Sequence, residues 1–362
     1  MFRGFWDSLP KPIIGLSPMD GVTDQPYRFM QKKYGQPDLL MTEFTSAEGI
    51  VHNATQLFRD FLFDESERPI VAQIFGKDPA AFRTTALILG YLGFDGIDIN
   101  MGCPAKSVRQ SGSGAALICT PLLAQELVRA TQAGVQDWMN GKTLDDCPEL
   151  KQKTKKAVMA RHVLLPEKYQ QRQELPISVK TRIGFDTPTV EAWIPYLLEV
   201  EPANLSIHGR TLKQMYTGQA NWEEIAKVVE LAKGSGTTVM GNGDIDSLET
   251  AKLRISETGV DGLLVGRATY GNPWIFQELT AWRDGKPVAP IEPTPEQRLQ
   301  MALEHTEVFE KAFPEDSFLP MRKHLAWYIK SFPFATDLRV QLMTAQNGED
   351  VKKVLKNYQA NT

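Results

Sequence analysis

Short apolar segments and longer segments with helical spacing alternate along this chain, and the alternation occurs eight times within about 285 residues. Most of the short segments are too continuously apolar for a strand with one face in water, which indicates parallel strands that are covered on both faces. The expected strands span residues 12–19, 39–45, 69–76, 96–103, 176–184, 204–210, 237–245 and 262–269. Eight strand–helix units in succession predict a (β/α)8 TIM barrel.

The junctions between these segments support the same interpretation. Asp78, Thr120, Thr187 and Asn272 each precede a proline, which is typical of a helix start because the missing N–H has no helical partner there. Helical spacing extends over residues 122–137, 190–200, 222–233 and 248–258. A doubly wound open sheet shares the alternation, but the turn after the first expected strand, SPMDGVTDQP, lacks its usual GxGxxG sequence.

Two regions fall outside the eight units. Residues 284–295 are rich in glycine and proline, and Thr294, Pro295 and Gln297 then form a helix-capping pattern. We therefore expect a barrel over residues 1–285 and a small all-helical C-terminal domain of three or four helices over residues 294–362. A polar insertion at about residues 138–175 separates the fourth helix from the fifth strand and is longer than the usual connection.

Composition narrows the class of protein. The net charge of -4 excludes a protein coated in positive charge, although a local basic patch remains compatible with it. The three cysteines form no CxxC pair, so we expect neither a disulfide scaffold nor a metal site. No apolar run reaches the length of a signal peptide or a membrane span. These features predict a soluble cytoplasmic protein without a membrane anchor, most simply a monomer.

Polar or reactive side chains terminate nearly every expected strand. In a TIM barrel the carboxyl ends of the strands converge on one rim, which carries the active site. The residues at these ends are Pro18, Met19, Glu43, Gln73, Asn100, Cys103, Lys180, Arg182, His208, Arg210, Asn242, Gly243, Asp244, Gly266 and Arg267. We therefore expect the functional site at this rim.

Four of these ends have a specific interpretation. Gly243 and Gly266 allow close backbone approach to a phosphate and Arg267 adds a fixed positive charge, at the usual phosphate position of this fold; the alternative is that the glycines only form tight turns. Lys180 ends a buried strand, so its ammonium either enters the barrel mouth or extends to solvent. His208 is either a site residue or a core histidine.

Cys103 differs from the other two cysteines, which are adequately explained as small buried apolar residues. It follows a strand end and begins the loop CPAKSVRQSGSG, whose glycines and serines are typical of a mobile lid. A thiol of ordinary pKa is mostly protonated at neutral pH and can donate a proton. We therefore expect Cys103 to act as an acid or as a nucleophile.

Several segments together resemble the tRNA-dihydrouridine synthases, and most of all their bacterial B-type branch. They are LSPMDGVTDQPYR, NMGCPAKSV, IHGRT, GNGDI, VGRA and MRKHLAWYIK, and the resemblance extends from about Ile14 to Tyr358 with a break at the insertion. The resemblance implies FMN-dependent reduction of the uracil C5=C6 bond in tRNA, with NADPH as the source of electrons. It also implies that the C-terminal helices recognise tRNA.

The resemblance further implies roles for individual residues. The flavin is expected to contact Pro18, Met19, Asp20, Gln73, Lys180 and His208, and its phosphate Asn242, Gly243, Asp244, Gly266 and Arg267. Cys103 is the expected proton donor. The candidates for tRNA contacts are Asn100, Lys106, Arg182, Arg210, Arg322 and Lys323, together with His324.

Two features depart from the expected charge of an RNA-binding protein. Residues 294–362 contain nine basic and nine acidic residues, so any contact with RNA must come from a local patch. Between Lys151 and Arg182, nine basic residues stand against two acidic ones. An RNA-binding arm is one hypothesis for this excess. However, helix-to-strand connections lie at the end of a barrel opposite the active site, which counts against it.

Two alternative functions remain open from the sequence. One is a flavin-dependent barrel that reduces a free small molecule, such as a pyrimidine. The other is an RNA-binding protein that keeps the fold without catalysing a reaction.

Overall fold

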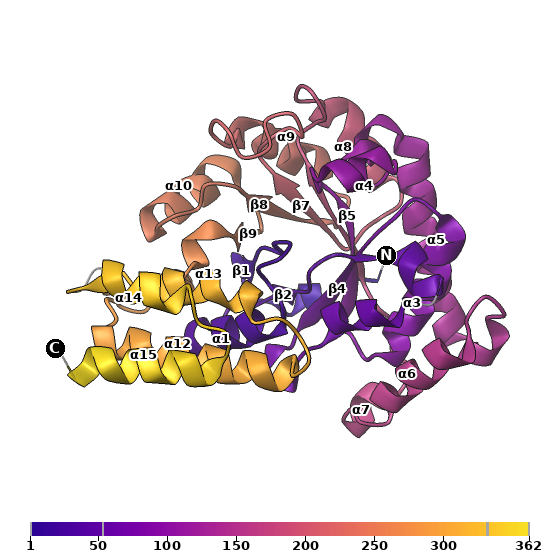
Figure 1. Cartoon of the computed structure of the whole chain (residues 1–362). Helices are drawn as coiled ribbons and strands as arrows, with labels where there is room; N and C mark the ends of the chain where they lie inside the picture. Colours follow the sequence, from indigo (N-terminus) through magenta and orange to yellow (C-terminus); the bar gives the residue numbers. More distant parts are fainter. Residues whose placement is uncertain (1, 53, 331–332, 361–362) are drawn as a thin grey trace.

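The computed structural model describes residues 2–52, 54–330 and 333–360, and it places eight parallel strands in a ring with helices around them (Figure 1). Neighbouring strands follow the order β1-β9-β8-β7-β6-β5-β4-β2, and a parallel bridge between Gly15 and Leu39 joins β1 to the residue before β2. The strands are β1 (Ile13–Leu16), β2 (Leu40–Met41), β4 (Ile70–Phe75), β5 (Gly96–Met101), β6 (Ile177–Arg182), β7 (Asn204–His208), β8 (Thr238–Asn242) and β9 (Gly262–Val265). The predicted TIM barrel is confirmed.

Each expected strand segment contains one barrel strand, but the strands end earlier than the sequence suggested. The strand expected over residues 12–19, for example, spans only Ile13–Leu16. The chain turns after it, and the Met19 N–H donates to Thr23 Oγ1 over 2.9 Å. The polar residues that follow the strands therefore belong to loops at the rim. A further short strand, β3 (Thr45–Ser46), pairs with the end of β4.

The helices around the barrel include the four predicted segments. They are α1 (Gln25–Gly35), α2 (Ala47–Val51), α3 (Pro79–Tyr91), α4 (Lys106–Gln110), α5 (Pro121–Met139), α8 (Val190–Leu198), α9 (Trp222–Ala232), α10 (Leu248–Thr258) and α11 (Ile275–Arg283). The capping prediction is confirmed for Asp78, which accepts from the Ala80 N–H over 3.0 Å. It is wrong for Thr187 and Asn272, because the chain first makes a turn and the helices begin at Val190 and Ile275.

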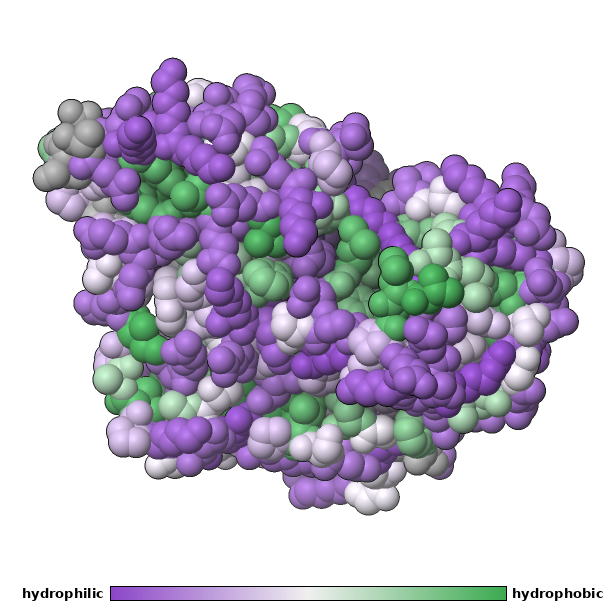
Figure 2. All heavy atoms as spheres, turned by 90° about the horizontal axis from the view of Figure 1, so that it is seen from below, coloured by the Kyte–Doolittle hydropathy of each residue, from purple (hydrophilic) through white to green (hydrophobic). Residues whose placement is uncertain are grey.

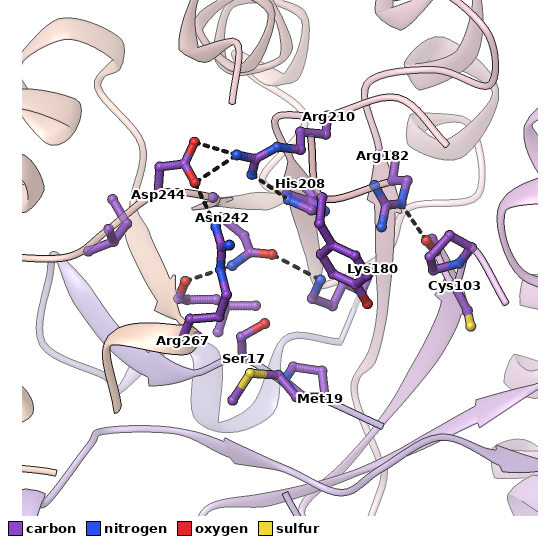
Figure 3. Close-up of a pocket in the computed structure, with 18 of the residues that line it drawn as sticks. Ser17, Met19, Cys103, Lys180, Arg182, His208, Arg210, Asn242, Asp244 and Arg267 are labelled. Atoms are coloured by element: carbon purple, nitrogen blue, oxygen red, sulfur yellow. Dashed lines mark hydrogen bonds and ion pairs between the residues drawn. The ribbon is translucent and has the colours of Figure 1, made fainter. Parts of the chain in front are cut away.

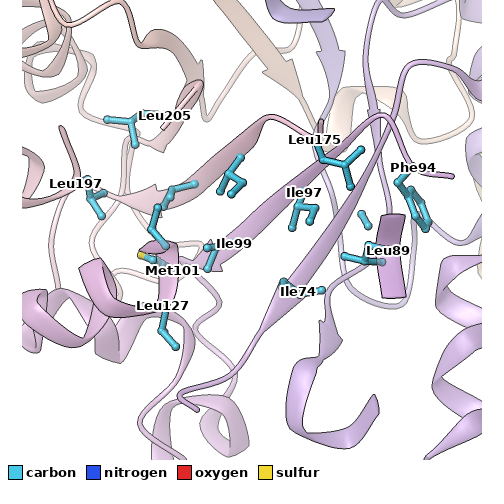
Figure 4. Close-up of a cluster of buried hydrophobic side chains, with 14 of the residues drawn as sticks. Ile74, Leu89, Phe94, Ile97, Ile99, Met101, Leu127, Leu175, Leu197 and Leu205 are labelled. Carbon is cyan, nitrogen blue, oxygen red and sulfur yellow. The ribbon is translucent and has the colours of Figure 1, made fainter. Parts of the chain in front are cut away.

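The barrel is held together by apolar side chains between the strands and the surrounding helices. Ile97 and Ile99 on β5 are fully buried, as are Leu89 on α3 and Leu127 on α5 (Figure 4). Removing this apolar area from water is the main stabilising contribution to the fold. The rigid wall that results fixes where the loops at the rim begin.

The C-terminal part consists of the helices α12 (Pro295–Ala312), α13 (Leu319–Tyr328), α14 (Ala335–Leu342) and α15 (Gly348–Ala360). The predicted cap is confirmed, since Thr294 and Gln297 bond to each other's backbone N–H groups. These helices lie beside α1 at one side of the barrel (Figure 1). They have their own apolar core, which Met30 of α1 and Trp274 join.

The insertion forms a short turn at Leu144–Asp146 and the helices α6 (Gln152–His162) and α7 (Glu167–Gln170), on the side of the barrel away from α12–α15 (Figure 1). Its basic residues are partly used within the protein. Arg161 donates to Phe58 O over 2.7 Å, and the Arg172 guanidinium lies 4.2 Å from the Trp138 ring. The charge available to RNA is therefore smaller than the sequence suggested.

Figure 2 shows the molecule from below, with α12 and α15 at one side and the insertion at the other. This face is mostly polar, with small groups of apolar residues among the polar ones. Among the helices of the described residues, none has the length and hydrophobicity needed to cross a membrane.

Candidate active site

A cavity of about 1100 Å³ opens at the carboxyl ends of the strands. Among the described residues, the ends of all barrel strands except β4 contribute to its wall. The predicted residues that line it are Pro18, Met19, Asp20, Asn100, Cys103, Lys180, Arg182, His208, Arg210, Asn242, Gly243, Asp244, Gly266 and Arg267. The predicted residues outside the cavity wall are Glu43, Gln73, Lys106, Arg322, Lys323 and His324. The sequence rule that polar strand ends converge therefore located the cavity.

Strand register places the polar side chains in one row. Asn100 lies opposite Lys180 on the neighbouring strand, and Arg182 lies opposite His208. His208 in turn lies opposite Asn242. Neighbouring parallel strands bring such partners close together, so five side chains from four strands face one cavity.

The loop that carries Cys103 is fixed by a chain of amide contacts. Asn100 Oδ1 accepts from the Cys103 N–H over 2.8 Å and from the Gly102 N–H over 3.1 Å. Asn100 Nδ2 donates to Gln73 Oε1 over 2.9 Å, and Gln73 Nε2 donates to Asp98 Oδ2 over 2.7 Å. Gln73 is thus fully buried beneath the cavity, where it supports Asn100.

Cys103 lies at one side of the cavity, and the Asp244–Arg267 pair lies across from it (Figure 3). Its side chain is mostly buried, and burial raises the pKa of the thiol above its ordinary value. A raised pKa keeps the proton on sulfur at neutral pH. This environment suits a proton donor better than a nucleophile, which acts as the thiolate.

Lys180 and His208 lie between these two sides (Figure 3). Lys180 Nζ donates to Asn242 Oδ1 over 3.2 Å, and burial lowers the pKa of Lys180 to about 8, so it remains mostly charged at pH 7. Burial and the nearby cations Arg182 and Lys180 lower the pKa of His208 well below its usual range. The imidazole is therefore neutral, and the cavity centre combines one buried cation with one uncharged ring.

The far corner of the cavity has the features of an anion site. Gly243 has a φ of 124°, and a Cβ there would lie 2.7 Å from Ala220 Cβ. A Cβ at Gly266 would have Met19 Sδ, at 3.5 Å, as its nearest neighbour, so the backbone there is open to a ligand. Arg267 adds a cation that is 57% exposed.

Asp244 organises the arginines of this corner. Its carboxylate accepts from Arg210 Nη2 over 2.7 and 2.8 Å and from Arg267 Nη2 over 3.0 Å (Figure 3). The Asp244 carboxylate is itself an anion and would repel a phosphate, so its side chain serves to hold the two guanidinium groups in place. The remaining N–H groups of Arg267 are the ones that can bind an anion directly.

Arg182 also has a structural task. Its guanidinium donates to Gly102 O over 2.6 Å (Figure 3) and to Thr211 O over 3.1 Å. It therefore joins the loop of Cys103 to the loop between β7 and α9. That second loop places Tyr216, which is 65% exposed, at the rim of the cavity.

Sequence reasoning missed three aromatic residues of the wall, namely Phe44, Tyr216 and Tyr270. Each lies a few residues beyond the polar strand end that drew attention. A signal was present, since all three follow a strand and precede the next helix on the active-site side of the fold. Taking the whole loop, and not only its first residues, would have included them.

The candidate tRNA contacts outside the cavity lie in two places. Lys106 is exposed on α4, directly after the lining residue Ala105. On α13, Arg322 Nε donates to Ala345 O over 2.8 Å and Lys323 donates to Gly21 O. The prediction for His324 is wrong, because it is 1% exposed and packs between other aromatic rings.

The comparisons with known proteins agree with this geometry. The dihydrouridine synthase family matches residues 15–144 and 162–362. The probable tRNA-dihydrouridine synthase 2 of Bacillus subtilis is 31% identical over 366 residues, which cover 99% of this chain and 98% of that protein. A probable tRNA-dihydrouridine synthase of Staphylococcus aureus is 32% identical over 367 residues, covering 99% and 97%.

Among solved structures, a morphinone reductase mutant in complex with tetrahydroNAD matches with a TM-score of 0.42 and 13% identity, over 79% of this chain and 89% of that one. At this level of similarity we draw no conclusion from the match.

The fold and the site define an enzyme with a TIM-barrel active site, an oxidoreductase that acts on a CH–CH bond. The chain belongs to the dihydrouridine synthase family. The family match is interrupted at residues 145–161, which lie within the insertion. Residues 145–161 therefore lie outside the matched family pattern, whereas the remaining parts of the insertion lie within it.

Proposed function

We propose that this protein is an FMN-dependent tRNA-dihydrouridine synthase that reduces the C5=C6 bond of particular uridines in tRNA, with NADPH as the source of electrons. The overall reaction consumes uridine, NADPH and one proton and yields dihydrouridine and NADP⁺. The observation that carries the proposal is the arrangement of the cavity, in which a protonated thiol at Cys103 lies across from a cationic corner at Arg267.

The residues present fit FMN as the cofactor. The open backbone at Gly266, the Gly243 turn and Arg267 form a corner suited to a phosphate. Lys180 supplies a buried cation that can stabilise negative charge on the ring system. When bound, FMN supplies the hydride, from its N5 atom to C6 of the uracil.

The protein itself must then supply a proton at C5. Hydride addition leaves negative charge on the uracil, which is neutralised when the Cys103 Sγ–H bond breaks and a C5–H bond forms. The thiolate regains its proton from solvent. Asn100 accepts hydrogen bonds from the Gly102 and Cys103 N–H groups, so the backbone that carries the thiol is fixed.

The substrate must enter as an extruded base. A uracil stacked in folded RNA cannot reach a thiol inside a barrel mouth, so the nucleotide has to rotate out of its stack at a cost of a few kcal/mol. Exposed Tyr216 at the rim and the exposed Lys106 nearby are suited to RNA, the first by stacking and the second by phosphate contact. The resemblance to the family implies that α13 and the neighbouring C-terminal helices supply the remaining contacts with tRNA.

The test is to purify the protein, record its absorbance spectrum and supply NADPH with unmodified tRNA or with free uracil. We expect a flavin spectrum and dihydrouridine only in the tRNA reaction, detected by mass spectrometry of the digested RNA. Product from free uracil alone would favour a small-molecule reductase. A colourless protein that binds tRNA without changing it would favour a non-catalytic RNA-binding role.

A further inference from the structure

The loop that follows β9, residues 266–271, joins the cavity to the C-terminal helices. Its inner side lines the cavity with Gly266, Arg267 and Tyr270. The Tyr270 ring stacks on Trp327 of α13 with 3.9 Å between centroids and an angle of 6° between planes. Tyr270 Oη also donates to Met19 Sδ over 3.6 Å, so one side chain contacts both the helical part and the cavity wall.

The backbone of this loop is held equally closely. Gly271 has a φ of 62°, and a Cβ there would lie 2.1 Å from Trp327 O, so only glycine fits against the end of α13. Arg298 of α12 donates to Gly271 O over 3.2 Å. The loop is therefore packed directly against two helices of the C-terminal part.

A second contact braces the start of the same loop. Tyr27 Oη bonds to Thr269 Oγ1 over 2.7 Å, and Thr269 Oγ1 donates to Gly266 O over 2.7 Å. The Tyr27 ring lies 5.2 Å from His324, which in turn lies 4.9 Å from Trp327. Both ends of the loop are thus tied to α13.

We propose that Trp327 is a positioning residue for the cofactor site, which it stabilises through Tyr270 without touching the ligand. The proposal rests on the proposed function for the identity of that ligand as FMN. Trp327 lies outside the cavity wall of the described residues, whereas the loop that it holds carries Gly266 and Arg267 of the anion corner. Packing of α13 and binding at that corner are therefore coupled.

Coupling of this kind acts in both directions. If α13 keeps the loop in the binding conformation, a bound ligand must in return stabilise the packing of α13. Lys323 of the same helix donates to Gly21 O, beside the cavity residues Met19 and Asp20. One helix of the C-terminal part thus contacts the β9 loop of the anion corner and the loop after the neighbouring strand β1.

The test measures the dissociation constant of FMN for the full-length apoprotein. We expect Trp327→Ala to raise it about three- to tenfold, the effect of losing one well-formed aromatic stack, and Trp327→Phe to restore most of the affinity. Trp282→Ala is the matched control, because this tryptophan is also partly buried against the barrel core but lies outside the cavity wall of the described residues. Its FMN affinity should equal that of the wild type.

A double-mutant cycle separates positioning from general loss of stability. If Trp327 acts through Tyr270, Trp327→Ala has no further effect on FMN affinity in a Tyr270→Ala background. If Trp327→Ala weakens FMN binding just as much in the Tyr270→Ala background, the proposal is overturned. It is also overturned if Trp327→Ala and Trp282→Ala lose equal FMN affinity.

Amide hydrogen exchange supplies a readout that needs no FMN. The Thr269 and Tyr270 N–H groups donate within the loop, to Gly266 O and Arg267 O. We expect both to exchange faster in Trp327→Ala than in Trp282→Ala, and equal rates would contradict the bracing role. If the wild-type protein binds no FMN, the proposed function and the coupling to FMN are overturned. The hydrogen-exchange rates would still test whether Trp327 holds the loop in place.

Discussion

At the scale of single residues, Asn100 decides where the reactive group of the cavity lies. Its side-chain oxygen accepts hydrogen bonds from the backbone N–H groups of Gly102 and Cys103, and its side-chain nitrogen donates to Gln73 Oε1. From the sequence, the resemblance to the dihydrouridine synthases implied that Gln73 contacts the flavin and Asn100 contacts tRNA. The structure shows that one hydrogen bond joins the two amides, while Asn100 also accepts from the Cys103 loop and Gln73 also donates to Asp98, since each polar atom of a buried amide requires a partner.

The role of Cys103 as an acid can be tested directly. We expect Cys103→Ala to lower dihydrouridine formation by about 10² or more, the usual contribution of a general acid, while FMN and tRNA affinities stay unchanged. The measurement is single-turnover product formation with saturating tRNA.

Cys119→Ala is the matched control for this variant. The expectation that Cys119 is buried is wrong, because it is an exposed free cysteine after the loop of Cys103. It lies outside the cavity wall of the described residues, so its removal should leave turnover at the wild-type level. Near-normal turnover of Cys103→Ala would refute the assignment of the proton donor.

At the scale of elements, the insertion is the feature whose charge invited a functional hypothesis. His162, at the end of α6, bonds to Tyr91 O over 2.8 Å. Tyr91 is the last residue of α3, which starts after the carboxyl end of β4, so this contact lies toward the end of the barrel away from the cavity. The exposed lysines of α6 are thus poorly placed for an RNA that enters the mouth.

We therefore expect the double variant Lys153→Gln, Lys156→Gln to keep the tRNA affinity within about twofold of the wild type, with the same dependence on salt. Both lysines are exposed, so the change should not disturb packing. Lys106→Gln on α4, close to the cavity, serves as the contrast and should weaken binding and reduce the salt slope by about one. A weaker dependence of tRNA affinity on salt in the Lys153→Gln, Lys156→Gln variant would support the hypothesis of an RNA-binding arm.

At the scale of the whole molecule, the barrel and the C-terminal helices meet at a cluster of buried rings. His305 and His324 lie 4.9 Å apart and contact Tyr27 of the barrel. His305 Nδ1 bonds to Tyr328 Oη over 3.0 Å, whereas neither ring nitrogen of His324 has a hydrogen-bond partner among the described residues. Burial keeps both imidazoles neutral in the folded protein.

This cluster makes stability depend on pH. Burial lowers the pKa of His305 to about 3 and that of His324 well below the ordinary 6.5, and Lys323 nearby lowers the latter further. The unfolded chain binds these protons below pH 6.5 and the folded chain does not, so stability falls as pH decreases from 6.5 toward 3. The expected slope is up to about 1.4 kcal/mol per pH unit for each histidine.

The measurement is urea unfolding at several pH values between 5 and 7. We expect His324→Phe to reduce the pH slope by removing one protonation site and two unpaired polar atoms, while stability at pH 7 is kept or increased. His52→Phe, at an exposed histidine, is the control and should leave the slope unchanged. An unaltered slope in His324→Phe would show that this ring is not the source.

The sequence by itself determined the barrel, a C-terminal part of three or four helices and the rim at which the cavity opens. Those conclusions depend on local rules, namely strand length, helical spacing, capping residues and the convergence of parallel strand ends. The same rules identified Cys103, Lys180 and Arg267 as members of one site.

Only the tertiary structure decided which polar atoms remain free to meet a ligand. The stacking of Tyr270 on Trp327, the burial of His324 and the use of Arg182 to hold two loops all join segments that are distant along the chain. Such contacts depend on how whole elements pack, and packing is set by the summed shape of many side chains, which no local pattern records.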